Sequence, residues 1–421
     1  MGKLILTTCL LIAFLIASCW TPMEPIKETK ETIEMRELTP SEKEVTGAAN
    51  TFGINLLAKL SELDDEKENI FISPLSISIA LGMALHGAEG ETQEEMKQVL
   101  EFHNMPIGDI NEAYRGLLDL LPYIDPDVEL LIANSMWYRI GFPVLDSYIE
   151  TNKKYFDAEV DALDFSLPEA SDIMNNWVNE KTKGLIEDIV PEEIDPLTVM
   201  YLINAVYFKG DWAIQFDKED TRDADFRLED GSTIPVKMMH QKDSFRVSLS
   251  YQDVSVIDLP YSDGHYSMTI VLPPHDVSIH ELTGSMTSEK WQTWLGKLPD
   301  EPREIDVYIP RFTLEYEKSL VDVLQALGMR RAFSPALAEF DGIYDREKIG
   351  GENLYISNVM HKTFVDVNEE GTEAAAATSV EFGVTSAPPA FRADSPFLMA
   401  IRESSSDTIL FIGKVYKPMS E

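Results

Sequence analysis

The stretch of residues 369–385 limits most strongly what this chain can fold into. From residue 372 onward its two charged residues, Glu373 and Glu381, both stand at odd positions. The even positions carry only uncharged residues: Thr372, Ala374, Ala376, Thr378, Val380, Phe382 and Val384. Because side chains alternate between the two faces of a strand, this segment fits a strand whose uncharged face is buried. The four consecutive alanines favour a helix instead, so an exposed alanine-rich linker and a short surface helix remain open at this point.

The chain is long and strongly acidic. Its 421 residues, 44% of them hydrophobic, suffice for one large domain or two ordinary ones with a sizeable core. There are 35 basic and 73 acidic residues, which gives a net charge of −38. Such a surface repels phosphate backbones, so we expect no nucleic-acid partner. The charge would attract a partner with a basic face, although it also serves solubility alone.

The first 19 residues have the pattern of an export signal, with Lys3 ahead of an apolar run from Leu4 to Ile16 that is too short to span a membrane comfortably. The run ends in Ile16-Ala17-Ser18-Cys19, which resembles the lipobox of bacterial lipoproteins. This resemblance implies a prokaryotic protein that is exported and anchored to the cell envelope or cell surface by a lipid on Cys19. An ordinary secretory signal that is cut nearby, giving a secreted protein, is the alternative.

The other cysteine, Cys9, lies inside the signal, so the mature chain cannot form an intramolecular disulfide and must be stabilised by packing. Residues 20–44 carry Pro22, Pro25 and Pro40 among Glu, Lys and Thr, which is typical of a flexible polar tether. No second linker follows, so we expect residues 45–421 to form a single domain.

The secondary structure that the pattern predicts places helices first and strands with interspersed helices later, which is an α+β order. The predicted helices cover residues 48–60, 74–84, 173–182 and 320–329. The predicted strands cover residues 130–140, 199–208, 255–260, 266–273 and 304–310. The near-continuous apolar run of 199–208 suits a central strand that is buried on both faces.

The sequence carries no recognisable catalytic motif. It has no Gly-x-Ser-x-Gly elbow, no His-Glu-x-x-His and no phosphate-binding glycine loop. His275 and His280 are five residues apart in a proline-bounded loop, which is a weak signal for a metal. Cysteine catalysis is excluded apart from Cys19. We therefore expect neither an enzyme nor a metal or cofactor.

The carboxy-terminal third closely resembles the serpins, the serine protease inhibitor superfamily. The resemblance rests on the glutamate-rich stretch with Gly371 and the alanine run, on Asn358–Val367, on Ser395–Ile401 and on Phe411–Val415. A further match is the block from Asn204 to Lys209-Gly210-Asp211-Trp212, and the likeness extends over residues 45–421. It implies a metastable α+β fold with mixed and antiparallel sheets, a bundle of helices and an exposed, insertable reactive loop over about residues 369–391. It also implies an inhibitor of the inhibitory type. A non-inhibitory serpin that acts as a binding or chaperone module is the alternative.

The resemblance also implies roles for individual residues. The loop hinge comprises Glu369, Glu370, Gly371, Thr372, Glu373, Ala374, Ala375, Ala376 and Ala377. A polar cluster that controls opening of the main sheet comprises Ser73, Ser76, Asn204 and His361. The alternative is that they are hydrogen-bonded polar groups of the core, and both roles can hold at once. A gate where the loop enters comprises Trp177, Arg311 and Glu369, the last two as a charged pair.

The reactive bond implied by the resemblance is Thr385–Ser386. In inhibitory serpins the cleaved residue usually lies fourteen residues after the hinge glycine, and the Pro-Phe pair after the loop begins about eleven residues later, at Pro396. A small Thr385 behind Val384 suits a shallow apolar pocket, so we expect an elastase-like serine protease, or a subtilisin-like one, as covalent acyl partner. Cleavage after Val384 is the main alternative, whereas Phe382 lies too early and Arg392 too late. We expect the inhibitor to be a monomer.

Overall fold

A computed structural model describes residues 36–65, 67–351, 353–371 and 389–419. The predictions for Cys19, for the hinge from Thr372 to Ala377 and for the bond Thr385–Ser386 lie outside the described residues. The helices are α1 (Pro40–Leu63), α2 (Pro74–Leu85), α3 (Gly90–Val99), α4 (Ile107–Leu120), α5 (Asp146–Phe156), α6 (Glu169–Lys181), α7 (Ile279–Gly284), α8 (Ser288–Leu295) and α9 (Val321–Leu327).

The strands form three sheets, and their bounds are β1 (Ile70–Ile72), β2 (Glu129–Arg139), β3 (Glu159–Leu163), β4 (Met200–Lys209), β5 (Arg222–Arg227), β6 (Thr233–Ser248), β7 (Ser255–Tyr261), β8 (Tyr266–Leu272), β9 (Arg303–Pro310), β10 (Phe312–Ser319), β11 (Met360–Val367), β12 (Ala390–Arg392), β13 (Phe397–Glu403) and β14 (Ile409–Val415). A nine-stranded sheet has the order β1-β14-β13-β8-β7-β6-β9-β12, with β5 paired to β6. A three-stranded sheet has the order β3-β2-β4, and β10 and β11 form a separate antiparallel pair.

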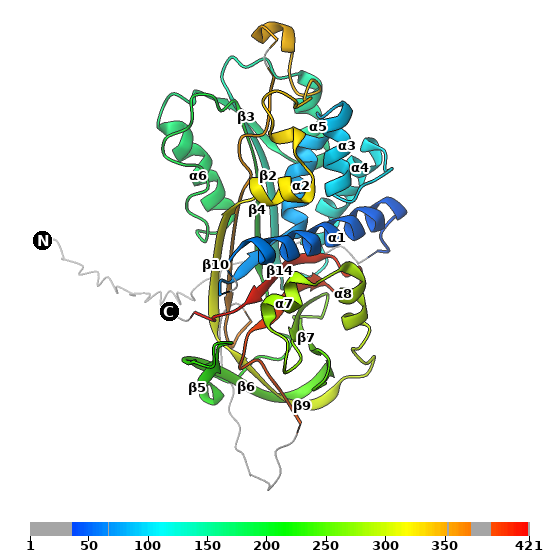
Figure 1. Ribbon diagram of the computed structural model, residues 1–421, viewed down its shortest axis with the longest axis vertical. Helices are drawn as coiled ribbons and strands as arrows, with labels where there is room; N and C mark the ends of the chain where they lie inside the picture. Colours follow the sequence, from blue (N-terminus) through cyan, green and yellow to red (C-terminus); the bar gives the residue numbers. More distant parts are fainter. Residues whose placement is uncertain (1–35, 66, 352, 372–388, 420–421) are drawn as a thin grey trace, which may run out of the picture.

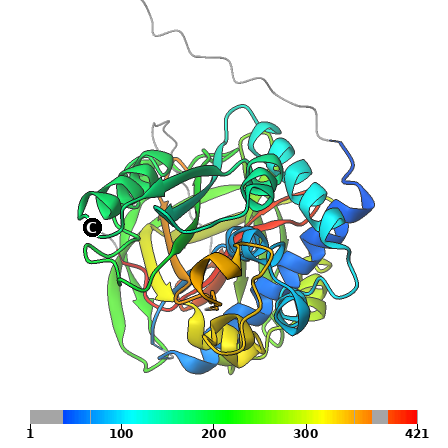
Figure 2. The same ribbon diagram turned by 90° about the horizontal axis from the view of Figure 1, so that it is seen from above.

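The molecule is elongated, with helices α2 to α5 at one end and most of the nine-stranded sheet at the other (Figure 1). Helices α2 to α5 gather at one end beside the upright strands β2 and β4, and α6 lies on the other side of these strands. The strands β5, β6 and β9 lie at the opposite end, and the view from above shows helices packed around the sheets (Figure 2). Most of the buried apolar side chains form one core that joins α1, α2 and the nine-stranded sheet. A second, smaller core, which contains Met174 and Ile203, fills the space between α6 and the strands β2 and β4.

The folded domain begins earlier than the predicted residue 45. Helix α1 starts at Pro40, and Thr39 and Glu42 cap it reciprocally through side chain and backbone. Leu38 is buried, and Arg36 pairs with Glu42 at 2.6 Å. The last part of the predicted tether therefore belongs to the fold, because Pro40 and Glu42 serve as helix-start residues rather than as linker.

Most predicted elements exist close to their expected bounds, but the burial of β4 differs from the prediction. Only Ile203 and Ala205 of this strand are buried, and its other residues are partly exposed. The reason is its position: β4 pairs with β2 on one side and forms the edge of its sheet on the other. The expectation of a central strand buried on both faces is therefore wrong for this conformation.

Candidate functional site

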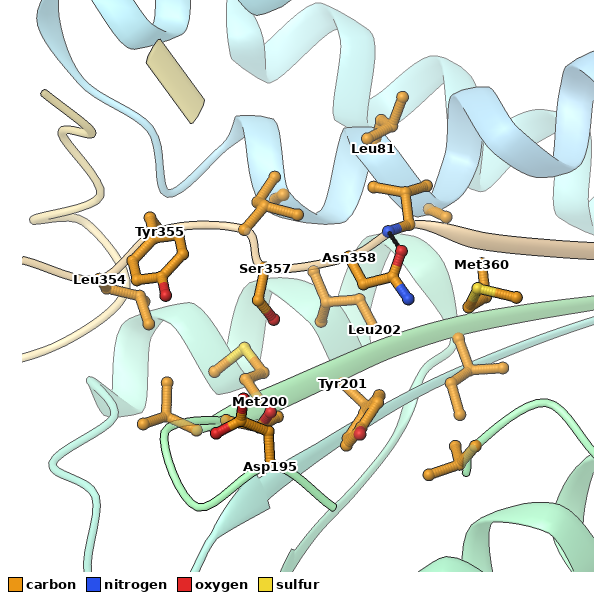
Figure 3. A pocket seen from close by; sticks show the side chains of 18 of the residues that line it. Leu81, Asp195, Met200, Tyr201, Leu202, Leu354, Tyr355, Ser357, Asn358 and Met360 are labelled. Carbon is orange, nitrogen blue, oxygen red and sulfur yellow. Dashed lines mark hydrogen bonds between the residues drawn. The ribbon is translucent and has the colours of Figure 1, made fainter. Parts of the chain in front are cut away.

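A cavity of about 560 Å³ separates β4 from β11. Residues 199–204 line one side of it and residues 353–361 line the other. The two strands belong to different sheets: among the described strands, β4 pairs with β2 and β11 pairs with β10, and β4 and β11 do not pair with each other. Figure 3 shows Met200, Tyr201 and Leu202 across from Ser357 and Met360, with the open space between them.

Helix α2 lies behind this cavity and the segment after α6 lies in front of it. Ile77, Ala80, Leu81 and Ala84 of α2 line the cavity. The segment of residues 189–199 also lines it. In β11 the odd-numbered side chains are buried and the even-numbered ones are partly exposed, so the strand separates a back face from a front face. On the front face, Lys362 Nζ donates to the carbonyl oxygen of Asp188 at 3.4 Å.

The segment in front is tied to α6 through Asn175. The Asn175 side-chain oxygen accepts from the backbone N–H groups of Ile189 and Val190, both at 2.9 Å, and its amide group donates to the Val190 carbonyl at 2.8 Å. An element that opened or filled the cavity from the front would therefore have to move α6 and this segment together.

The predicted polar cluster comes together at the first turn of α2, on the back face. The backbone N–H of Ser73 donates to Nε2 of His361 in β11 at 3.1 Å. One turn later the Ser76 hydroxyl donates to the side-chain oxygen of Asn204 in β4, whose amide group donates to Asn134 of β2 at 2.6 Å. The start of α2 thus contacts both strands that border the cavity: Ser73 binds β11 and Ser76 binds β4. Their role in opening the sheet stays a prediction.

His361 is fully buried at this junction. Burial lowers the pKa of its imidazole to about 3, because a charged ring would lose its hydration there. The ring is therefore neutral at physiological pH, which it must be for Nε2 to accept the hydrogen bond from Ser73.

A tight turn ends β11. Asn368 and Gly371 form an isolated antiparallel bridge, with reciprocal backbone hydrogen bonds of 3.3 Å. Gly371 has φ +112°, and a Cβ at this position would lie 2.4 Å from the carbonyl oxygen of Gly210 and the nitrogen of Trp212. Only glycine fits here without displacing backbone. Since β10 occupies one edge of β11, the turn reverses the chain on the other edge, toward the end of β4 at Lys209.

The side chain that secures this turn is Trp212. Its backbone N–H donates to the Glu370 carbonyl and its indole N–H donates to the Asn368 carbonyl, both at 2.9 Å. Its ring stacks on Tyr261 with the centroids 4.5 Å apart. Phe216 adds a further backbone hydrogen bond to the Glu369 carbonyl at 2.8 Å.

These contacts correct the predicted gate. Trp177 lies in α6, packs edge-on against Trp137 and donates to Glu159 of β3 at 2.7 Å, so it does not contact the turn. Trp212 takes the position that was assigned to Trp177. Its place in the block that follows β4, beside the hinge, is the signal that the sequence analysis missed.

The predicted pair of Arg311 and Glu369 is not formed. Glu369 is buried and accepts from the Thr221 hydroxyl at 2.7 Å, whereas Arg311 is exposed and its backbone N–H donates to Lys237. The neighbouring Glu370 pairs with Lys218 instead. Glu369 and Glu370 are thus held by the segment of residues 210–221.

The described residues hold neither a metal site nor a membrane-spanning helix. No group of three or more His, Cys, Asp or Glu side chains in this part of the chain is arranged to hold a metal ion, and the pair of His275 and His280 does not form one. No helix among the described elements is long and apolar enough to cross a membrane.

Known proteins resemble this chain over most of its length. The family model "Serpin (serine protease inhibitor)" matches residues 47–418. Serpin B6 of Pongo abelii is 36% identical over 378 residues, which are 88% of this chain and 98% of that protein. Human thyroxine-binding globulin, solved in complex with thyroxine, superposes with a TM-score of 0.80 and 28% identity over 90% of this chain and 100% of its own. The thermophilic serpin Tengpin, solved in its native state, gives a TM-score of 0.78 and 31% identity over 92% and 97%.

Proposed function

The chain belongs to the serpin family of serine protease inhibitors, which are not enzymes, and we propose that it traps its target as an irreversible suicide substrate. In this proposal the residues after Gly371 insert as a strand between β4 and β11 once the target protease has cut the loop. The observation that carries the proposal is the turn of Asn368–Gly371, which reverses the chain at the ends of β4 and β11, the two strands that border the cavity farther along.

Two registers support this insertion independently. On the β11 side, Asn368 faces Gly371 in an antiparallel bridge. Each step forward along the loop from Gly371 would therefore pair with one step backward along β11 from Asn368. On the β4 side, Gly371 lies against Asp211, and the same count applies backward along β4. Residues that face each other across an antiparallel pair share a face. The even-numbered loop residues would therefore join the buried odd-numbered face of β11 and the face of β4 that carries Asn204, which both point toward α2.

The chemistry belongs to the protease until insertion begins. Its serine hydroxyl attacks the carbonyl carbon of Thr385, the bond to Ser386 breaks, and the new amino terminus at Ser386 leaves. Thr385 remains as an ester on the protease serine. Insertion then pulls the ester along the cavity, and the protease loses the alignment of its oxyanion hole and triad before water can hydrolyse the ester.

Insertion is favourable because it completes a sheet. Each net backbone hydrogen bond contributes roughly 0.5–1.5 kcal/mol, so a strand of about ten residues contributes on the order of 10 kcal/mol. This gain is comparable to the whole stability of a typical domain. The active form would therefore persist because of a kinetic barrier rather than because it is the state of lowest free energy.

The test is to mix the protein with elastase-like and subtilisin-like proteases and look for a complex that survives denaturing electrophoresis. We expect such a complex, together with a released carboxy-terminal fragment that begins at Ser386, as its intact mass would show. Cleavage without a complex would favour the alternative, a non-inhibitory binding or chaperone module. A fragment that begins at Thr385 would move the reactive bond to Val384.

We also propose that the protein is exported and anchored to a prokaryotic cell envelope through a lipid on Cys19. The lipobox-like Ile16–Cys19 and the proline-containing tether that follows support this. Detergent partitioning of a Cys19→Ala variant tests it, since unchanged partitioning into the detergent phase would rule out the lipid anchor.

A further inference from the structure

The cavity changes character along its length, which the proposed insertion alone does not explain. At the end of the cavity that is closer to the hinge, its back face carries the polar cluster of Ser73, Ser76, Asn204 and His361. Farther along, toward Met200, the lining from behind is apolar. We call Leu81, Ala84, Phe340 and Ile343 the apolar floor; all four line the cavity and are buried from solvent.

The apolar floor is one continuous patch built by two elements. Leu81 and Ala84 lie in the last two turns of α2. Ile343 reaches the same end of the helix, because its side chain lies against Gly87, two residues beyond the helix end. Phe340 is three residues earlier, and the Ile343 N–H donates to the Phe340 carbonyl at 2.9 Å.

The loop sequence has the same change of character at the matching positions. Counted along both strands from Gly371, Thr378 of the proposed inserted strand would face Asn204 and His361. By the same count Phe382 would face Met200 and Ser357, which Figure 3 shows on opposite sides of the open space. The even-numbered residues thus present a hydroxyl at the polar cluster and an aromatic ring at the apolar floor.

We propose that the apolar floor is the docking site for Phe382, and that this side chain anchors the far end of the inserted strand; the inference rests on the insertion proposed above. Phe382 is the largest side chain among the even-numbered residues of the segment, where the others are Thr, Ala and Val. Aromatic side chains contribute most to the burial of apolar surface. The anchor determines whether the last residues before Thr385 complete the strand.

The test compares Phe382→Ala with Glu381→Ala, whose side chain would lie on the front face. Each protein is cut in its loop, and the melting temperature of the cut form is compared with that of its intact form. The wild type and Glu381→Ala should show the same large rise on cleavage. Phe382→Ala should show a rise that is smaller by a few degrees, with the intact melting temperature unchanged, and Phe382→Leu should restore most of it.

The floor offers a second, reciprocal variant. Ala84→Leu narrows the site, so it should also reduce the rise, and Phe382→Ala in the same protein should recover part of the loss, because the two residues compete for one space. An equal rise for Phe382→Ala and the wild type would overturn the anchor while leaving insertion intact. No rise in the wild type itself would instead overturn the proposed insertion.

Discussion

At the scale of residues, Gly371 and Trp212 decide where the chain can go after β11. Gly371 has a positive φ and lies so close to the backbone of residues 210–212 that a side chain would collide with it. Trp212 holds the turn through both of its N–H groups. The turn is therefore a fixed pivot, and the residue directly after it is the first that has to enter between β4 and β11.

We expect Thr372→Arg to convert the inhibitor into a substrate. Thr372 would enter first and on the back face, so an arginine there would bury an unpaired charge at a cost of several kcal/mol. Insertion should slow, and hydrolysis of the ester should win. The measurement is the ratio of complex to cleaved inhibitor on a denaturing gel.

Glu373→Arg is the matched control, because residue 373 would point to the front face. It should keep the wild-type ratio. If Thr372→Arg also keeps it, the assignment of faces in the hinge is wrong.

His361 predicts a dependence on acid. Its pKa is about 3 in the fold, against about 6.5 for an unperturbed histidine, so the unfolded chain binds a proton that the fold excludes. The stability that the neutral ring contributes is fully present above about pH 6.5 and falls by about 1.4 kcal/mol for each pH unit from there down to about pH 3. Chemical denaturation at pH 7 and pH 5 measures this loss.

His86 also contributes to this pH dependence, because burial lowers its pKa to about 4. The wild-type profile therefore reports on both histidines, and a variant at position 361 is needed to separate them. A glutamine at position 361 can accept the Ser73 N–H without titrating. His361→Gln should therefore have a profile that is less steep by about one proton between pH 7 and pH 5. If the wild type and His361→Gln lose stability equally between pH 7 and pH 5, protonation of His361 does not contribute to the pH dependence of stability.

At the scale of elements, the loop lies between two attachments of unequal strength. Behind it, the turn is fixed by Trp212 and Phe216. Ahead of it, β12 is a strand of three residues that pairs only with β9 among the described strands. One of its side-chain contacts is a stack in which the Tyr308 ring lies against Arg392, 3.5 Å from its guanidinium carbon, and against His240 with the ring centroids 4.4 Å apart; Phe391 of the same strand is buried in the core.

Tyr308→Ala should accelerate spontaneous inactivation. An uncut loop can insert only if β12, at its far end, is released from β9, and loss of the Tyr308 ring removes a cation–π contact of about 0.5–2 kcal/mol. Activity should decay several-fold faster at constant temperature, with a heat-stable product. Glu304→Ala, an exposed change on the same strand β9, is the control, and equal decay of the two variants would show that the stack does not restrain β12.

Much of this could be predicted from the sequence, and the exceptions have physical reasons. The elements carried by periodicity, such as the strand 266–273 and the helix of residues 320–329, were confirmed because their local pattern and their burial agree. The partial exposure of β4 could not be predicted, because its apolar sequence does not show whether another strand pairs with each of its two edges. Trp177 lies before β4 in the chain and Trp212 lies after it, so the sequence places both tryptophans close to the same strand. Only the packing shows that Trp212 is the one that contacts the hinge.

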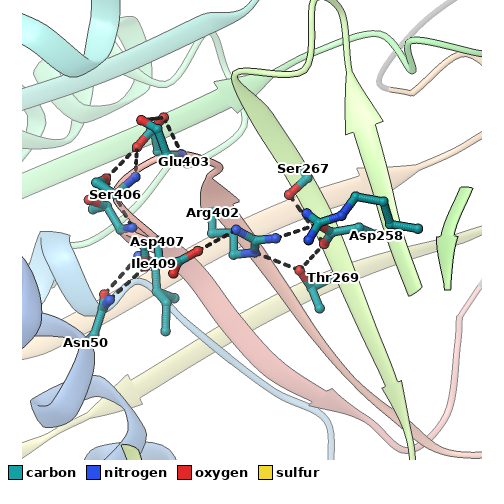
Figure 4. A network of polar contacts seen from close by, with 12 residues as sticks. Asn50, Asp258, Ser267, Thr269, Arg402, Glu403, Ser406, Asp407 and Ile409 are labelled. Atoms are coloured by element: carbon teal, nitrogen blue, oxygen red, sulfur yellow. Dashed lines mark hydrogen bonds and ion pairs between the residues drawn. The ribbon is translucent and has the colours of Figure 1, made fainter. Parts of the chain in front are cut away.

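At the scale of the whole molecule, the fold is stable without disulfides although a cavity separates β4 from β11; we call the space between these two strands the seam. Arg402 is buried and binds Asp258, Thr269 and Asp407, which links β7, β8 and the turn after β13 (Figure 4). The Asp407 carbonyl accepts from Asn50 of α1 at 2.7 Å. Removing one partner from such a buried ion pair costs about 3–5 kcal/mol, so the network secures the nine-stranded sheet against α1. The seam between β4 and β11 lies elsewhere in the molecule, so it could open or fill without disturbing this network.

The central claim, that the cut loop fills the seam in one register, is tested most directly by a cysteine crosslink. A form that begins at Trp20 has no cysteine of its own, so Asn358→Cys and Glu381→Cys would be the only pair. These residues would face each other on the front face of neighbouring strands, at a separation that a disulfide spans. We predict that the disulfide forms after cleavage of the loop and not before, and that Asn358→Cys with Phe382→Cys, on opposite faces, does not form it. A cut protein in which Asn358→Cys and Glu381→Cys stay unlinked, or link no faster than in the intact protein, would contradict the account.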